Sequence, residues 1–190
     1  MTPILFFDTE TTGLPKWKEP SDSPEQPHLV QLAAILADQD TQKIISSMDV
    51  IIRPDDWEIS EEMTEIHGIS QERAMTVGIP EALALDMFLN LWRGGSTAAY
   101  NSNFDQRIIR IGIKRYNQNE LMQEAWAVKE NHFCTMRAAQ AVIGGKAPKL
   151  SEAYEHFTDK VLEGAHNAMV DTTACMEIYW EIMGVPKCSF

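Results

Sequence analysis

Apolar residues occur in short runs in the first third of the chain and at helical spacing in most of the remainder. A run at 4–7 that ends at Asp8 predicts a buried strand with a polar edge at its end. Runs at 30–37 and 43–53, the latter rich in isoleucine and valine, predict two further strands. The short links between these runs favour a mixed or antiparallel meander.

The later part of the chain favours helices. Pro80 can open a helix that runs to about Trp92, and residues 97–100 form another short strand candidate. Short helices and turns are expected over 58–76, and a short helix over 151–157, for which Ser151 is a candidate N-cap. Further helices are expected over 103–115, 135–143 and from Asn167 to about Met183, and helix is the only expectation for 117–133. Early strands and late helices predict an α/β fold with a mixed sheet. Without repeats or a linker, residues 1–190 are expected to form a single domain.

Charge and cysteine content narrow the function classes. The formal net charge is −12, whereas a protein that wraps a duplex is normally basic. Any nucleic acid is therefore expected to bind through a small local site. The three cysteines form no paired spacing that would favour disulfides or a zinc site. No signal peptide or apolar membrane span is evident, so we expect a cytoplasmic protein that does not bind membranes.

The segment at 7–14 carries two carboxylates, Asp8 and Glu10, separated by one residue. On a strand, this spacing points both side chains to the same side. Two such carboxylates repel each other unless a cation lies between them, and hard oxygen ligands suit Mg²⁺ or Mn²⁺. Taken alone, however, Asp-x-Glu is common at polar strand ends.

Two further segments place acidic or imidazole side chains at predicted element ends. Asp105 ends the segment 101–105 at the start of a predicted helix, where an acidic residue usually serves only as a cap. His166 precedes the last predicted helix, and Asp171 lies within it. A lone His–Asp pair at a helix start is also usually structural.

The three segments together are far more specific than any one of them. Their order resembles the motifs of the DEDDh (DnaQ-like) exonucleases, the family of the proofreading subunit of bacterial replicative polymerases and of RNase T. The resemblance extends over about residues 4–182 and includes Ile-His-Gly-Ile at 66–69. It implies the RNase H-like fold, a central mixed sheet flanked by helices, with motifs at 8–10, 101–105 and 166–171.

The resemblance also implies a chemistry, the release of nucleoside 5′-monophosphates from a 3′ end with two divalent cations, Mg²⁺ or Mn²⁺. Asp8 would bridge the two ions, Glu10 and Asp171 would complete one metal site, and Asp105 would hold the second ion. His166 would be the general base, a role that suits an imidazole at neutral pH.

Substrate contacts are implied by the same resemblance. Thr11, through its backbone, and Thr12 would lie beside the terminal 3′-OH, and Leu14 would wedge against a base. Glu62 and His67 match a family segment that contacts the terminal nucleotide. The structural alternative for His67 is a turn histidine before Gly68.

Two basic sets could form the local nucleic-acid site. Arg107, Arg110 and Lys114 recur at helical spacing, and Lys16-Trp17-Lys18 follows the first motif. A basic–aromatic–basic run suits a single strand, although a solvated face is the ordinary explanation for either set.

Several alternatives remain open at this stage. Single-stranded DNA is favoured as substrate, but the motifs do not exclude RNA, whose 2′-OH is read by other groups. A polymerase or other protein partner is also conceivable, yet only 183–190 follows the last predicted helix, which favours a stand-alone or loosely associated exonuclease. A non-catalytic binding module of the same fold would be expected to have lost one of the five motif residues, and all five are present.

Overall fold

The computed structural model describes residues 1–117 and 119–184. A five-stranded sheet in the order β3-β2-β1-β4-β5 forms the centre of the fold. Its strands are β1 (Pro3–Thr11), β2 (Leu29–Asp38), β3 (Ile44–Ile51), β4 (Ser96–Ala99) and β5 (His132–Cys134). β1, β2 and β3 form an antiparallel meander, whereas β4 pairs in parallel with β1 and β5 in parallel with β4. The expectation of a mixed sheet is confirmed.

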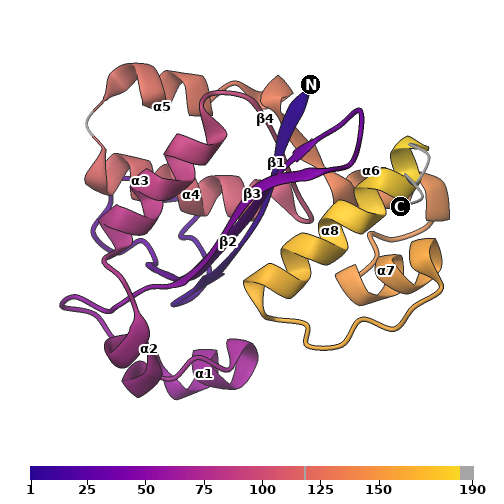
Figure 1. Cartoon of the computed structure of the whole chain (residues 1–190). Coiled ribbons are helices and arrows are strands. Elements are labelled where there is room, and N and C mark those ends of the chain that lie inside the picture. Colours follow the sequence, from indigo (N-terminus) through magenta and orange to yellow (C-terminus); the bar gives the residue numbers. More distant parts are fainter. Residues whose placement is uncertain (118, 185–190) are drawn as a thin grey trace.

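Helices cover both faces of the sheet (Figure 1). The helical elements are α1 (Glu61–His67), α2 (Gln71–Val77), α3 (Glu81–Trp92), α4 (Ser102–Tyr116), α5 (Glu120–Trp126), the 3-10 turn η1 (Lys129–Asn131), α6 (Thr135–Ile143), α7 (Leu150–Thr158) and α8 (Ala168–Met183). α3, α4 and α5 lie on one face, α6, α7 and α8 on the other, and α1 and α2 lie at one end.

The alternation of side chains along β1 divides the core into two clusters. Leu5 and Phe7 pack with the α3–α5 side, where Phe7 meets Phe88 and Trp126 edge to face. On the other side of the strand, Phe6 contacts Tyr179 and Trp180 of α8 in the same manner, and Ile4 lies in the same cluster. Continuing the alternation, Thr9 points toward α4, and Asp8 and Glu10 toward α8.

Three sequence-based expectations about local structure were wrong. The first strand does not end at Asp8 but continues to Thr11, because it stays paired with β2 along that length. Residues 117–133 include the first two residues of β5 in addition to helix, and this strand of three residues is too short to show alternation. The N-cap of α7 is Lys149, not Ser151, and its N–H donates to the Glu152 carboxylate at 2.8 Å.

Cys134 and Cys175 are free thiols, and Cys188 lies outside the described residues, as does most of the segment after Met183. No helix among the described residues has the length and apolar character needed to cross a bilayer.

Candidate active site

Asp8 and Glu10 lie side by side along β1, and both are only partly exposed. Burial raises the pKa of Asp8 well above its ordinary value, and the negative charges of Asp105, Asp171 and Glu10 raise it further. Burial, together with the charges of Asp171 and Asp105, raises the pKa of Glu10 to about 8. The structure therefore brings the four predicted carboxylates within electrostatic range of one another.

Asp105 is held toward this cluster by Thr9 of β1. The carboxylate oxygen Oδ1 of Asp105 accepts the Thr9 N–H at 3.1 Å and the Thr9 hydroxyl at 2.8 Å. β4 pairs with β1 only over residues 4–6 of β1. Beyond these residues, the N-terminus of α4 lies beside the same edge of β1. Burial raises the pKa of Asp105 to about 7, although both hydrogen bonds from Thr9 lower it.

His166 and Asp171 enter from the start of α8. One ligating atom each from Glu10, His166 and Asp171 lies within 4.8 Å of the other two. The His166 N–H donates to Oδ2 of Asp171 at 3.1 Å, while the imidazole is exposed. His166 has a φ of 66°, a left-handed conformation that non-glycine residues seldom adopt and that often occurs at functional sites.

The start of α8 is fixed by a residue that the sequence reasoning missed. The side-chain oxygen of Gln31, a buried residue of β2, accepts the Ala168 N–H at 3.1 Å, and its amide donates to Asp49 at 2.7 Å. Asn167 caps the next two N–H groups of the helix. A glutamine within an otherwise apolar strand was the available signal, because buried amides need partners.

Thr11 and Thr12, two of the residues predicted to contact the substrate, form hydrogen bonds within the protein. The Thr11 hydroxyl donates to the Gly13 carbonyl at 2.7 Å. Thr12 and His28 exchange two hydrogen bonds, both 3.0 Å long, in which the Thr12 N–H donates to the His28 carbonyl and the Thr12 hydroxyl accepts the His28 N–H. By contrast, the side chain of Leu14 is 79% exposed and free to meet a ligand.

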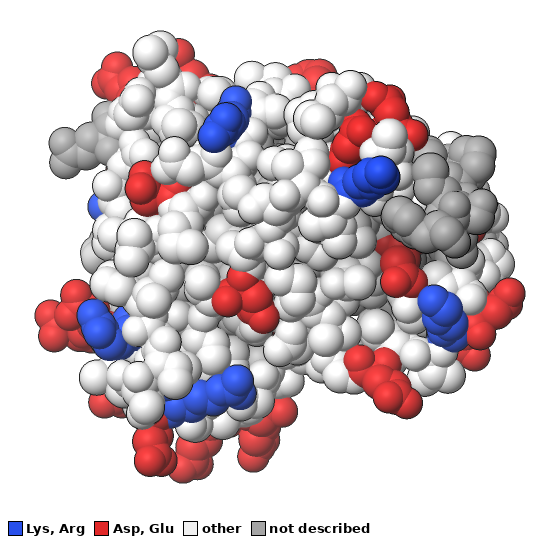
Figure 2. Space-filling model, in the orientation of Figure 1, with Lys and Arg blue, Asp and Glu red and all other residues white. Residues whose placement is uncertain are grey.

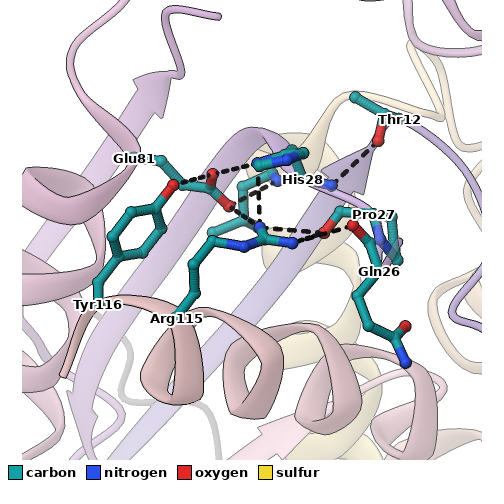
Figure 3. Close-up of polar contacts among 8 residues, drawn as sticks. Thr12, Gln26, Pro27, His28, Glu81, Arg115 and Tyr116 are labelled. Atoms are coloured by element: carbon teal, nitrogen blue, oxygen red, sulfur yellow. Dashed lines mark hydrogen bonds and ion pairs between the residues drawn. The ribbon is translucent and has the colours of Figure 1, made fainter. Parts of the chain in front are cut away.

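His28 is in turn held by a buried carboxylate, Glu81 (Figure 3). Oε2 of Glu81 lies 2.7 Å from Nδ1 of His28 and accepts the Tyr116 hydroxyl at 2.9 Å, and Oε1 accepts the Leu29 N–H at 3.0 Å. Arg115 lies 3.4 Å from Oε1. Nη1 of Arg115 also lies 3.0 Å from Nδ1 of His28. This Glu81 cluster, which the sequence reasoning also missed, ties the loop after β1 to α3 and α4.

Glu62 and His67 occupy different environments on α1. Glu62 is exposed in the first turn, whereas His67 is buried in the last turn before the left-handed Gly68. Nδ1 of His67 accepts the Ile69 N–H at 3.1 Å, which places the proton on Nε2. Burial lowers the pKa of His67, and Nε2 is buried with no partner among the described residues.

Comparison with solved structures places this architecture in the RNase H-like fold. Exonuclease I matches with a TM-score of 0.76 and 20% identity, over 97% of this chain and 41% of its own. The E. coli exonuclease I complex with a dT13 oligonucleotide matches with a TM-score of 0.77 and 20% identity, over 97% of this chain and 42% of its own. This chain thus spans about two fifths of those structures.

Residues 5–179 match the family RNase_T, described as "Exonuclease", and the chain belongs to that family. It is a nuclease of the DnaQ-like 3′→5′ exonuclease class. Two PolC-type DNA polymerase III proteins are similar over 117 residues, from Thermotoga petrophila at 33% identity and from Thermotoga maritima at 30%. In each case the similarity covers 59% of this chain and 7% of the polymerase.

Proposed function

We propose that this exonuclease shortens single-stranded DNA from the 3′ end, with two divalent cations and with His166 as general base. The observation that carries the proposal is the convergence of Glu10, His166 and Asp171, whose ligating atoms lie within 4.8 Å of one another. The negative charge of Asp105 raises the pKa of both Asp8 and Glu10, so these carboxylates lie near one another as well.

The donor set fits a divalent cation. Among the described residues, no lysine or arginine forms an ion pair with Asp8, Glu10, Asp105 or Asp171. Oδ1 of Asp171 is buried and has no hydrogen-bond partner in the described part of the chain, an arrangement that costs free energy unless a ligand satisfies it. Bound Mg²⁺ or Mn²⁺ would relieve charge on the phosphoryl oxygens and on the departing 3′ oxygen.

The protein groups would then move one proton and orient the phosphodiester. The imidazole of His166, which is exposed, takes a proton from water as the water oxygen forms a bond to phosphorus. The bond from phosphorus to the 3′ oxygen of the preceding nucleotide breaks, and that oxygen acquires a proton. The products are a nucleoside 5′-monophosphate and a strand one nucleotide shorter that ends in a 3′-OH.

The terminal nucleotide has candidate contacts on two elements. The Nε2–H of His67 is a buried donor without a partner in the described structure, which suits a hydroxyl or phosphate oxygen of a ligand. Leu14, 79% exposed beside the first motif, offers an apolar surface to a base. Thr11, Thr12 and Glu62 are assigned to this subsite with them.

Single-stranded DNA is favoured because solved structures of E. coli exonuclease I that share this fold were determined with dT13 and other oligonucleotides. A polymerase partner is supported by the similarity to PolC-type DNA polymerase III. The test is to incubate 5′-labelled single-stranded DNA and the matching RNA with Mg²⁺, with Mn²⁺ and with chelator.

The wild type should give a ladder that shortens from the 3′ end and that chelator abolishes. Asp8→Ala should be inactive, whereas Asp22→Ala, which removes an exposed carboxylate in the loop after β1, should match the wild type. Faster cleavage of RNA would reassign the substrate. Binding of both strands without cleavage under any condition would support the non-catalytic module.

A further inference from the structure

A groove of about 870 Å³ lies beside the candidate active site. Its walls come from the loop after β1, from α4, from η1 and from α6, and they include Leu14, Trp17, Arg107, Arg110, Lys129 and Arg137. Leu14 is four residues beyond Glu10, and the lining residue Phe104 directly precedes Asp105. The groove therefore begins next to the carboxylate cluster.

The lining of this groove is cationic although the chain carries a net charge of −12. Four arginine and lysine side chains line it, and no aspartate or glutamate of the described chain does. On the face shown in Figure 2, by contrast, acidic side chains gather over α1 and α2, and lysines and arginines stand apart from one another. A local cluster of positive charge on an acidic protein indicates an anionic ligand.

The four cations of the groove are not neutralised within the protein. None of them forms an ion pair in the described part of the chain. Arg107 donates to the Glu19 carbonyl, but its Nε is buried and has no partner there. Burial and the positive charge of Arg107 lower the pKa of Arg110. Like charges held this close are destabilising until an anion binds between them.

Large apolar side chains accompany these cations. Trp17 is 58% exposed and Leu14 is 79% exposed, both at the groove. Exposed aromatic rings beside arginines suit a ligand that alternates phosphates with flat bases, because bases stack on the rings while phosphates pair with the cations. A solvated basic face would not need an exposed tryptophan.

We propose that this groove binds the nucleotides upstream of the scissile bond of a single strand. Its cations contact successive phosphates, and Trp17 stacks on a base. The inference rests on the proposed function, since the 3′ end of the strand must lie at the carboxylates. It assigns to Arg107, Arg110, Lys129 and Arg137 the sequence-independent affinity for the strand. Only part of the predicted basic sets takes part, because Lys16 pairs with Glu25 and Lys114 with Gln123.

The test compares a groove variant with a variant of the same net charge. The groove variant is Arg110→Gln with Arg137→Gln. The control is Lys43→Gln with Lys146→Gln, two exposed lysines that do not line the groove. Each protein is assayed on dT20 and on the p-nitrophenyl ester of thymidine 5′-monophosphate, which has no upstream nucleotides.

In the groove variant, KM for dT20 near 0.1 M salt should rise ~20-fold, and the slope of log affinity against log salt should fall by about 1.4, because each single-strand phosphate contact contributes about 0.7. Hydrolysis of the ester should be unchanged, which also shows that the variant is folded. The control should match the wild type on both substrates.

Equal KM values for dT20 in the groove and control variants would overturn the proposal, as would an unchanged salt slope. If the wild type hydrolyses neither substrate, the proposed function fails, and the groove is then judged by fluorescence anisotropy of labelled dT20. A ~20-fold loss of binding in the groove variant alone would still support the groove, and equal binding by all three proteins would reject it.

Discussion

Thr9 of β1 donates two hydrogen bonds, from its N–H and from its hydroxyl, to one carboxylate oxygen of Asp105 on α4. These residues are 96 positions apart in the chain. The contact links the first motif directly to the second and fixes the direction of a carboxylate that burial alone would make costly to ionise.

Removing the Thr9 hydroxyl should therefore weaken the site without unfolding it. In Thr9→Val, the 2.8 Å bond is lost and the pKa of Asp105 rises further, because that bond lowers it. We expect kcat/KM at pH 7 to fall about tenfold, which corresponds to the free energy that one hydrogen bond to a charged group contributes. The loss should be smaller at pH 9, where Asp105 is ionised in both proteins. Thr76→Val, whose hydroxyl bonds only within α2, is the control and should have no effect.

His166 can be tested by a substitution that suits its backbone. Asparagine tolerates the left-handed conformation of residue 166 but cannot act as general base at neutral pH. His166→Asn should lower kcat by about 10²–10⁴-fold while Mn²⁺ binding measured by calorimetry stays within twofold of the wild type. If Mn²⁺ affinity instead falls as far as in Asp171→Asn, the imidazole is a metal ligand and not the base.

Stability without metal should depend on pH in an unusual direction. The folded-state pKa values of Glu10 and Asp105, about 8 and about 7, lie above their ordinary values. A group with a raised pKa stabilises the fold below its unfolded pKa, and that stabilisation is lost as pH rises through the folded value. In chelator, Tm should thus fall by about 3 °C or more between pH 6 and pH 8.5.

Two comparisons assign this pH effect to the carboxylate cluster. Adding Mg²⁺ should raise Tm more at pH 8.5 than at pH 6, because the cation offsets repulsion that exists only when the carboxylates are ionised. Asp171→Asn should show a shallower fall of Tm in chelator. A Tm that is constant or rises over this pH range would contradict the arrangement of charges described above.

Gln31 should matter more for the start of α8 than its partner Asp49 does. Gln31→Leu leaves the buried Ala168 N–H without an acceptor, at a cost of about 1–3 kcal/mol. We expect a Tm lower by roughly 3–10 °C together with reduced kcat, because α8 carries Asp171. Asp49→Ala removes only the hydrogen bond that the Gln31 amide donates to Asp49. In thermal melts, this variant should lose less Tm than Gln31→Leu. Equal losses would show that strand pairing, not helix anchoring, is what Gln31 provides.

The sequence predicted most elements because their periodicity is local. The apolar run that contains Phe6 and Phe7 and the helical spacing of Ile108 and Ile111 are visible without tertiary contacts. The five motif residues were predicted from a pattern, and the structure brings them into one electrostatic cluster. By contrast, β5 has too few residues to carry a pattern.

The contacts that orient the site could not be predicted from the sequence. The bond from Ala168 to Gln31 joins residues 137 positions apart, and the bond from Leu29 to Glu81 joins residues 52 apart. Their formation depends on strand order and on how α4 and α8 lie against β1, which only the folded chain defines. Likewise, the groove combines Trp17 with cations of three other elements, two of which, η1 and α6, had not been linked to nucleic acid.

The paired hydrogen bonds between Thr12 and His28 close the loop after β1 at its neck, and Glu81 clamps that neck to the helices. A surface loop whose ends are fixed in this way can change in length and composition at little cost to the framework beneath it. Leu14 and Trp17, which line the groove, both lie within this loop. Residues 13–27 could therefore be replaced as one segment, which would change the walls of the proposed strand-binding groove while the carboxylates of Asp8 and Glu10 keep their positions.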